Sequence, residues 1–168
     1  QVQRPEDLEA AKERIRAILR DYYGRLKNRQ FELADLALHV TLGKEPEKYT
    51  KTTPQHVKAA KILEALTGRK MKAGDIISFV KVNPIRIDEV VRRAKVPSAR
   101  SKLASELKEF FKDKVIDVLP VELAAREDVD VDKYLSLLES TFEQILDALG
   151  MSFSEVVGLT RLESFLSG

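Results

Sequence analysis

Apolar residues recur every three or four positions over three long stretches, and this periodicity limits the fold more than any other feature. The stretches are residues 5–22, 53–68 and 132–149, and each has one apolar stripe. A stripe of that spacing is the signature of an amphipathic helix with one face buried. The chain has 168 residues, of which 43% are hydrophobic, so it is long and apolar enough for one domain with an attached tail.

The ends of these helices carry recognisable residues. Pro5 suits the first turn of the first helix, and Thr53 before Pro54 predicts a capped start for the second. Asp132 can cap the third helix. Glycines predict where the second and third helices end, at Gly68 and Gly150.

Two shorter stretches carry a strand pattern instead. Large apolar residues alternate over 36–42, and 76–82 is rich in β-branched residues and is expected to end at Asn83-Pro84. Residues 85–117 predict two basic helices, roughly 87–94 and 98–115, separated by Pro97. The expected fold class is therefore α+β, mainly helical, with a small antiparallel sheet.

The residue types leave little room for catalysis. The absence of cysteine excludes disulfides, thiolate metal sites and a cysteine nucleophile, and the only histidines are His39 and His56. The seven glycines are dispersed, so no phosphate-binding glycine loop exists. We expect no complete catalytic site and no metal site. The closest acidic cluster fits a solvated loop before a helix better than an oxygen-ligand metal site: Glu127, Asp128, Asp130 and Asp132.

Charge is distributed unevenly along the chain. Residues 30–115 hold 18 Lys and Arg against 11 Asp and Glu, whereas residues 116–168 hold three against 11. A basic middle favours a polyanionic partner, although the two parts could also attract each other within the chain. No stretch approaches the length of a membrane span and the N-terminus is too charged for a signal peptide, so we expect a soluble, cytoplasmic protein.

Residues 44–61 form the strongest candidate binding segment. The segment combines lysines, hydroxyls and one aromatic ring with the start of the second helix, whose free N–H groups attract phosphate. A solvated basic loop before an ordinary helix is the competing interpretation. The candidate contacts are Lys48, Tyr49, Lys51, Thr52, Thr53, His56, Lys58 and Lys61.

The last residues suggest a second binding element. Leu162, Phe165 and Leu166 are spaced as one turn of helix that presents an apolar surface. This spacing is typical of a peptide that docks in a partner's groove, and it equally fits a tail that folds back on its own domain.

Six segments together form a pattern that extends over nearly the whole chain: 31–42 (FELADLALHVTL), 47–61 (EKYTKTTPQHVKAAK), 72–80 (KAGDIISFV), 120–123 (PVEL), 130–134 (DVDKY) and 145–150 (ILDALG). In this order they resemble the C-terminal part of archaeal family B DNA polymerases, which is the end of the palm followed by the thumb. Gln55 departs from the pattern, because it separates Pro54 from His56 where the family has "P-H-V".

The resemblance implies a division of the chain into three parts. Residues 1–43 would be the palm's last helix and strand, and 44–150 a thumb-like helical domain. Residues 84–117 would be a basic insertion in that thumb, which could extend the grip on DNA or bind an accessory subunit. Residues 151–168 would be the tail.

The resemblance also implies a function. A thumb grips primer–template duplex through the phosphate backbone, while the Mg²⁺-binding aspartates lie in the palm upstream, so this chain would be part of a nucleotidyltransferase without its catalytic site. The expected location is the nucleoid. The high charge and absence of cysteine fit a heat-adapted source.

The tail resembles the family's sliding-clamp peptide in its apolar positions, although Leu159 stands where the family has glutamine. The alternative function is a non-enzymatic helical adaptor that docks on a sliding clamp or another replication partner through this peptide. A hydrolase that uses the acidic residues 127–132 is a remote third hypothesis.

Overall fold

The structure is a computed structural model that describes residues 4–93, 100–112 and 115–158. The chain forms two compact units. The helical unit consists of residues 1–31 and 131–168, and the sheet unit is the continuous stretch 32–130. Assignment of segments to palm and thumb stays a prediction.

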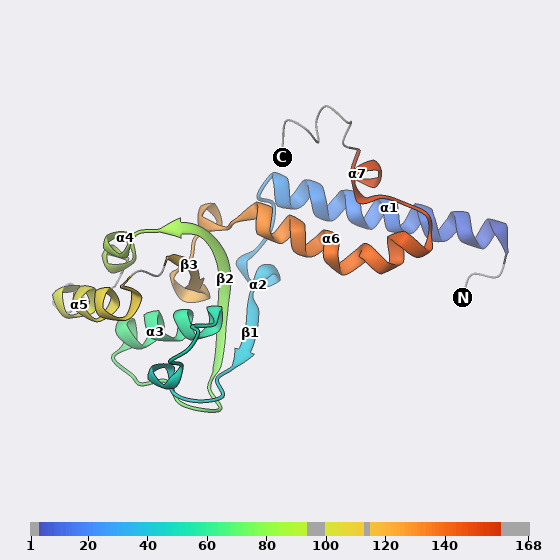
Figure 1. The fold of residues 1–168 in the computed structure, drawn as a ribbon. Coiled ribbons are helices and arrows are strands. Elements are labelled where there is room, and N and C mark those ends of the chain that lie inside the picture. Colours follow the sequence, from blue (N-terminus) through green and yellow to red (C-terminus); the bar gives the residue numbers. More distant parts are fainter. Residues whose placement is uncertain (1–3, 94–99, 113–114, 159–168) are drawn as a thin grey trace. The chain divides into compact units, whose positions relative to one another are not determined.

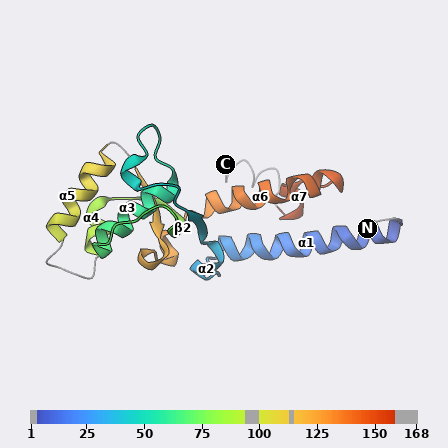
Figure 2. The same ribbon diagram turned by 90° about the horizontal axis from the view of Figure 1, so that it is seen from below.

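The helical unit is built from the two ends of the chain. Helices α1 (Pro5–Lys27) and α6 (Val131–Ala148) run antiparallel and side by side, and the short α7 (Phe153–Val156) packs against both (Figures 1 and 2). Their common core contains Leu19, Leu146 and Val156. Both long helices are therefore confirmed.

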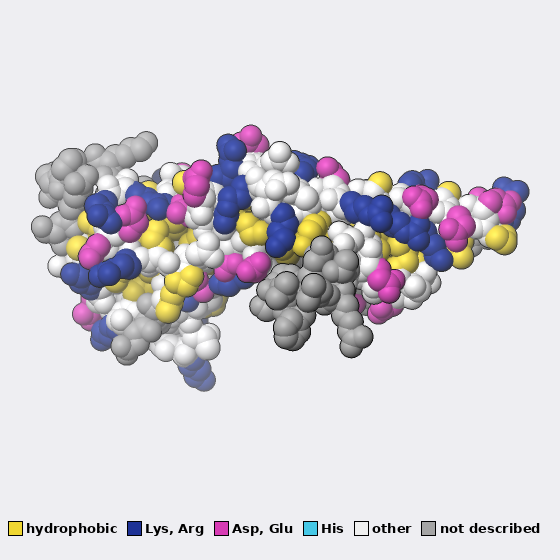
Figure 3. Space-filling view, turned by 90° about the horizontal axis from the view of Figure 1, so that it is seen from above, with side chains coloured by type: hydrophobic (Ala, Val, Ile, Leu, Met, Phe, Trp, Pro, Cys, Tyr) yellow, Lys and Arg dark blue, Asp and Glu magenta, His cyan; other side chains and the backbone are white. Residues whose placement is uncertain are grey.

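Details of the helical unit differ from the prediction. Asp132 does not cap α6, because the helix already begins at Val131 and Asp132 lies in its first turn. Ile18 and Tyr22 belong to the predicted stripe of α1, yet 41% and 43% of their surfaces are exposed. Lys and Arg side chains lie along α1 with acidic side chains among them (Figure 3).

The sheet unit contains three antiparallel strands in the order β1-β2-β3. They are β1 (Leu38–Thr41), β2 (Ile76–Ile85) and β3 (Ile116–Pro120). Phe79 of β2 lies between Leu38 of β1 and Pro120 of β3. The predicted fold class, mainly helical with a small antiparallel sheet, is confirmed.

One strand prediction was wrong, and one strand was not predicted. Strand β2 does not end at Asn83-Pro84 but continues to Ile85, because the register shifts between Lys81 and Ile85 and accommodates a proline that cannot donate a hydrogen bond. No strand was predicted after residue 115, where β3 lies. The matched segment 120–123 comprises the last residue of β3 and the short 3₁₀ helix η3 (Val121–Leu123).

The sheet unit also contains α3 (Gln55–Thr67), α4 (Ile87–Arg92) and α5 (Arg100–Phe111). Helix α3 packs on β2 and β3, α5 packs on α3, and α4 packs on α5. Thr53 does not cap α3, since the N-cap is Pro54 and no side chain caps this end. Gly68 ends α3 with φ of 72°, as predicted. The two basic helices α4 and α5 are shorter than predicted.

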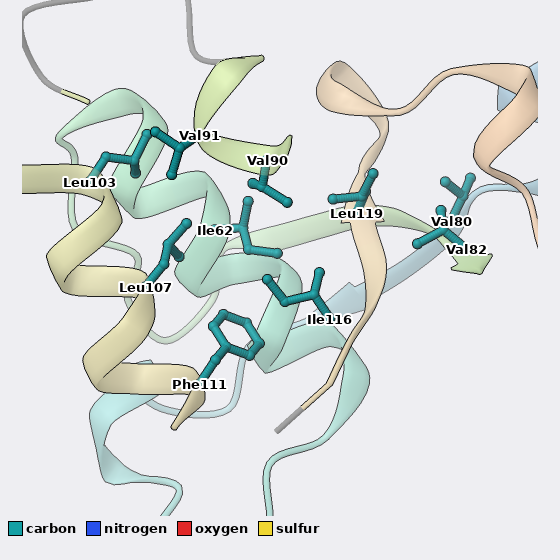
Figure 4. Close-up of a cluster of buried hydrophobic side chains, with 10 residues drawn as sticks. All are labelled: Ile62, Val80, Val82, Val90, Val91, Leu103, Leu107, Phe111, Ile116 and Leu119. Carbon is teal, nitrogen blue, oxygen red and sulfur yellow. The ribbon is translucent and has the colours of Figure 1, made fainter. Parts of the chain in front are cut away.

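The core of the sheet unit joins these helices to β2 and β3. Leu103, Leu107 and Phe111 of α5 face Ile62 of α3 (Figure 4). A second cluster packs the other residues of α3, among them Val57 and Ala60, against β2. The unit thus gives rigid support to the loops that connect its elements. The rest of the chain in this unit forms α2 (Leu33–Leu36), η1 (Pro46–Lys48) and η4 (Arg126–Asp128).

Candidate nucleic-acid interface

The candidate binding segment begins with the connection from β1 to α3, residues 43–54, here called the basic loop. Tyr49 organises it: its hydroxyl accepts a hydrogen bond from the Gly43 backbone N–H at 3.2 Å. The Lys44 ammonium lies 4.7 Å from the centre of the Tyr49 ring, and His56 packs edge-on against the same ring. Pro46 is buried beneath. Tyr49 therefore holds the loop in shape.

The outer positions of the basic loop are open to solvent. Lys48, Lys51 and Thr52 are exposed, and Thr53 is half-buried. The Lys48 ammonium lies 3.3 Å from Glu45, an exposed pair that contributes little. Lys51 forms no ion pair with any residue that the structure describes. Lys51 and Thr52 are thus the best placed to contact an external anion.

Lys58 and Lys61 are held inside the sheet unit instead. The Lys58 ammonium donates to the Val115 carbonyl at 3.4 Å and to Asp117 at 3.5 Å. The Lys61 ammonium donates to Glu47 at 3.1 Å and to Glu64 at 3.4 Å. Only 16% and 18% of these two lysine side chains are exposed. A phosphate would have to displace existing acidic partners to reach them.

The N-terminus of α3 lies next to the basic loop. The backbone N–H groups of Val57 and Lys58 bond to the Pro54 carbonyl, whereas those of Gln55 and His56 have no acceptor among the described residues. Free N–H groups at a helix start attract anions. Burial lowers the pKa of His56, so its imidazole is neutral at pH 7 and adds no charge.

Sequence reasoning left out one basic segment that the fold brings to this site. Residues 69–75, between α3 and β2, contain Arg69, Lys70 and Lys72, all exposed. Backbone hydrogen bonds connect this turn to Leu42, just before the basic loop. The link joins positions about 30 residues apart, so no local pattern could have revealed it.

The acidic cluster of residues 127–132 does not form a metal site. Asp128 accepts two hydrogen bonds from the Arg93 guanidinium, at 2.6 and 2.9 Å. Within residues 4–93, 100–112 and 115–158, no three His, Cys, Asp or Glu side chains are placed to hold a metal ion. Family B polymerases use Mg²⁺, but these residues do not fit it, and no metal-dependent step is assigned to them.

Several cations of residues 84–117, the predicted insertion, are paired locally. Arg92 pairs with Glu89, and Lys112 with Glu109. Arg93 is held by Asp128, Glu89 and the Leu123 carbonyl. Part of the insertion, and the tail residues Leu162, Phe165 and Leu166, lie outside the described residues. No described helix is long and apolar enough to cross a membrane.

The fold and this site define a class of protein, a mainly helical chain whose described residues place an exposed basic loop on a small antiparallel sheet. Comparison with known proteins identifies the family. The sequence profile described as DNA polymerase family B matches residues 1–149, and the chain belongs to this family. The predicted resemblance to family B polymerases is confirmed at that level.

Individual relatives agree with the profile. DNA polymerase 1 of Saccharolobus solfataricus is 36% identical over 163 residues, which cover 97% of this chain and 15% of that protein. DNA polymerase 1 of Sulfolobus acidocaldarius is 34% identical over 161 residues, covering 96% and 15%. For DNA polymerase 1 of Aeropyrum pernix the identity is 33% over 165 residues, covering 98% and 14%. The chain thus spans about 15% of the length of the curated relatives it matches.

Proposed function

We propose that this chain is the thumb-bearing part of a DNA-directed DNA polymerase and grips primer–template duplex through its phosphate backbone during replication. The observation that carries the proposal is the basic loop, with Lys51 and Thr52 exposed beside the uncapped start of α3. Contacts of this kind position a duplex without reading its sequence. Membership of the polymerase family supplies the duplex as the polyanion.

The contacts fall into two groups by their present partners. Lys48, Lys51 and Thr52 face solvent and would meet phosphate directly, and Thr53 and His56 would add neutral hydrogen bonds. Tyr49, Lys58 and Lys61 hold the loop and α3 in place. The proposal therefore assigns the direct charge contacts to Lys48 and Lys51.

The test is binding of the chain to a fluorescent primer–template duplex over a salt series, with a second duplex of scrambled sequence. Each duplex phosphate contact contributes about 0.9 to the slope of log K against log salt. Lys48→Gln with Lys51→Gln should lower the slope by about 1.8 for both sequences alike. The matched control is Arg14→Gln with Lys27→Gln, two exposed cations of α1. Equal slopes in all three proteins would refute the proposal.

Docking of the tail on a sliding clamp is a separate proposal for the partner of this chain. It is supported by the helical spacing of Leu162, Phe165 and Leu166 and by the family resemblance. The double variant Phe165→Ala with Leu166→Ala should no longer be captured by the clamp and should still bind the duplex. Clamp binding without any duplex affinity at low salt would favour the adaptor alternative.

A further inference from the structure

The turn between α3 and β2, residues 69–75, is fixed against the start of the basic loop. The Leu42 backbone N–H donates to the Asp75 carbonyl at 2.8 Å, and the Gly74 N–H donates to the Leu42 carbonyl at 2.9 Å. Gly74 has φ of 93°, a conformation that suits glycine. Because Leu42 directly precedes Gly43, the turn and the loop leave the sheet at the same edge.

A charge effect is consistent with these hydrogen bonds. Burial of Glu47 favours its neutral form, but its own backbone N–H, Lys61 and the charge of Lys70 outweigh burial and lower the pKa of Glu47. The two segments make one surface, here called the basic edge: Lys44, Lys48, Lys51, Arg69, Lys70 and Lys72.

The acids at this edge are already engaged. Glu45 pairs with Lys48, and Glu47 pairs with Lys61 from α3. The Asp75 carboxylate accepts the backbone N–H of Lys72 at 2.9 Å, which closes the turn. Among the residues described, the remaining cations form no ion pair: Lys44, Lys51, Arg69, Lys70 and Lys72. The basic edge therefore has a net positive charge that an external anion can neutralise.

The other side of the loop has the opposite character. A groove between the loop, α3 and α5 is lined by Glu47, Glu106 and Glu109 beside the ring of Phe110. The cations in it are already paired, Lys61 with Glu47 and Lys112 with Glu109. The groove has three acids against two paired cations, so it attracts phosphate less than the basic edge does, and a polyanion would approach the sheet unit from the basic edge.

From this arrangement we infer that Arg69, Lys70 and Lys72 form a second set of phosphate contacts, so that the loop and the turn bind the duplex backbone together. The inference rests on the proposed duplex-binding function. It extends that function from the basic loop to a second segment, the turn between α3 and β2. Three more cations on one rigid edge would increase the salt dependence of binding without adding sequence preference.

The experiment compares two triple variants of equal charge. The turn variant has Arg69→Gln, Lys70→Gln and Lys72→Gln, and the control has Arg14→Gln, Arg25→Gln and Lys27→Gln on α1. All six side chains are exposed, and the closing Asp75 contact uses the backbone of Lys72, so both proteins should melt like the unmodified chain. The turn variant should bind the primer–template duplex with a salt slope lower by about 2.7, and the control should not change. The swap Arg69→Lys with Lys70→Arg and Lys72→Arg should retain the slope.

The outcomes separate the inference from the function on which it rests. If Lys48→Gln with Lys51→Gln lowers the slope and the turn variant does not, duplex binding stands and the inference is overturned. If the turn variant and the α1 control lower the salt slope equally, net charge alone explains the effect and the inference is also overturned. If neither loop nor turn variant changes the slope, the proposed function itself fails.

Discussion

Lys51 and Lys58 are seven positions apart, yet their side chains differ in exposure and in partners. Lys51 is exposed and unpaired among the described residues, whereas Lys58 holds Asp117 and the Val115 carbonyl. We predict that Lys51→Ala changes the free energy of unfolding by less than about 0.5 kcal/mol. It should lower the salt slope by about 0.9, the contribution of one phosphate contact. Lys58→Ala should cost about 1 kcal/mol of unfolding free energy and leave the slope unchanged. Urea unfolding and duplex titration of both variants check this, and a slope change in Lys58→Ala alone would reverse the assignment.

The pair Lys61–Glu47 predicts a pH dependence at the scale of single residues. The pKa of Glu47 is lowered in the folded chain, so its contribution to stability is complete above its unfolded value of 4.5 and is lost as pH falls through the folded value. Burial opposes the charge of Lys61, but its two acidic partners raise the pKa of Lys61 above 10.5, so that contribution is lost only as pH rises through the folded value.

Thermal melting of the unmodified chain and of Glu47→Gln measures this effect. The unmodified chain should be the more stable of the two at pH 7, and the difference should shrink steadily once pH falls below 4.5. A difference that stays constant from pH 7 to pH 3 would show that the Glu47 carboxylate contributes nothing through its charge.

At the scale of elements, the end of α4 depends on one arginine. Arg93 forms a two-point pair with Asp128 and donates to the Leu123 carbonyl, so it ties α4 to η3 and η4. Only 24% and 14% of the Arg93 and Asp128 side chains are exposed. Arg93→Ala should therefore cost about 2–4 kcal/mol, because it removes both hydrogen bonds that the guanidinium donates to the half-buried Asp128.

The neighbouring Arg92 supplies the control for that prediction. It also pairs with Glu89, but 70% of its side chain is exposed, and such pairs contribute about 0.5 kcal/mol or less. Chemical unfolding of Arg93→Ala and Arg92→Ala should thus give clearly different losses. Similar small losses would mean that the Arg93 pair is as weak as a surface pair.

The sequence predicts those elements whose pattern is local. Helices α1, α3 and α6 show one apolar stripe each, and β1 shows alternation, so each was located within a few residues. Strand β3 was missed because four of its five residues are buried and the strand therefore shows no alternation. The extension of β2 past Pro84 depends on a bulge that only the pairing with β3 and Val129 creates.

The candidate site shows the same limit. Residue type and a helix start were enough to propose 44–61, but Lys58 pairs with Asp117 of β3 and Lys61 pairs with Glu47 of the basic loop. The turn at 69–75 joins the site through hydrogen bonds to Leu42. Such contacts follow from tertiary packing, and no spacing along the chain encodes them.

At the scale of the whole molecule, the two units differ in the size of their cores. Among the residues that the structure describes, the sheet unit has two clusters of buried residues. In the described part of the helical unit, a smaller cluster lies around Leu19, Leu146 and Val156, and Ile18 and Tyr22 of α1 are exposed. Buried apolar area is the main source of stability, so the sheet unit should be the more stable of the two.

This difference predicts how the chain can be divided. Residues 32–130 are continuous and contain all three strands, so this piece should fold alone and bind duplex DNA with the salt slope of the full chain. A piece cut at the boundaries implied by the family resemblance, 44–150, lacks β1 and with it Leu38, Val40 and Leu42, which pack in the second cluster. The piece 44–150 should therefore melt at a lower temperature than the piece 32–130. Circular dichroism melting and duplex titration of both pieces are the measurements, and a more stable 44–150 would show that β1 is dispensable to the stability of the sheet unit.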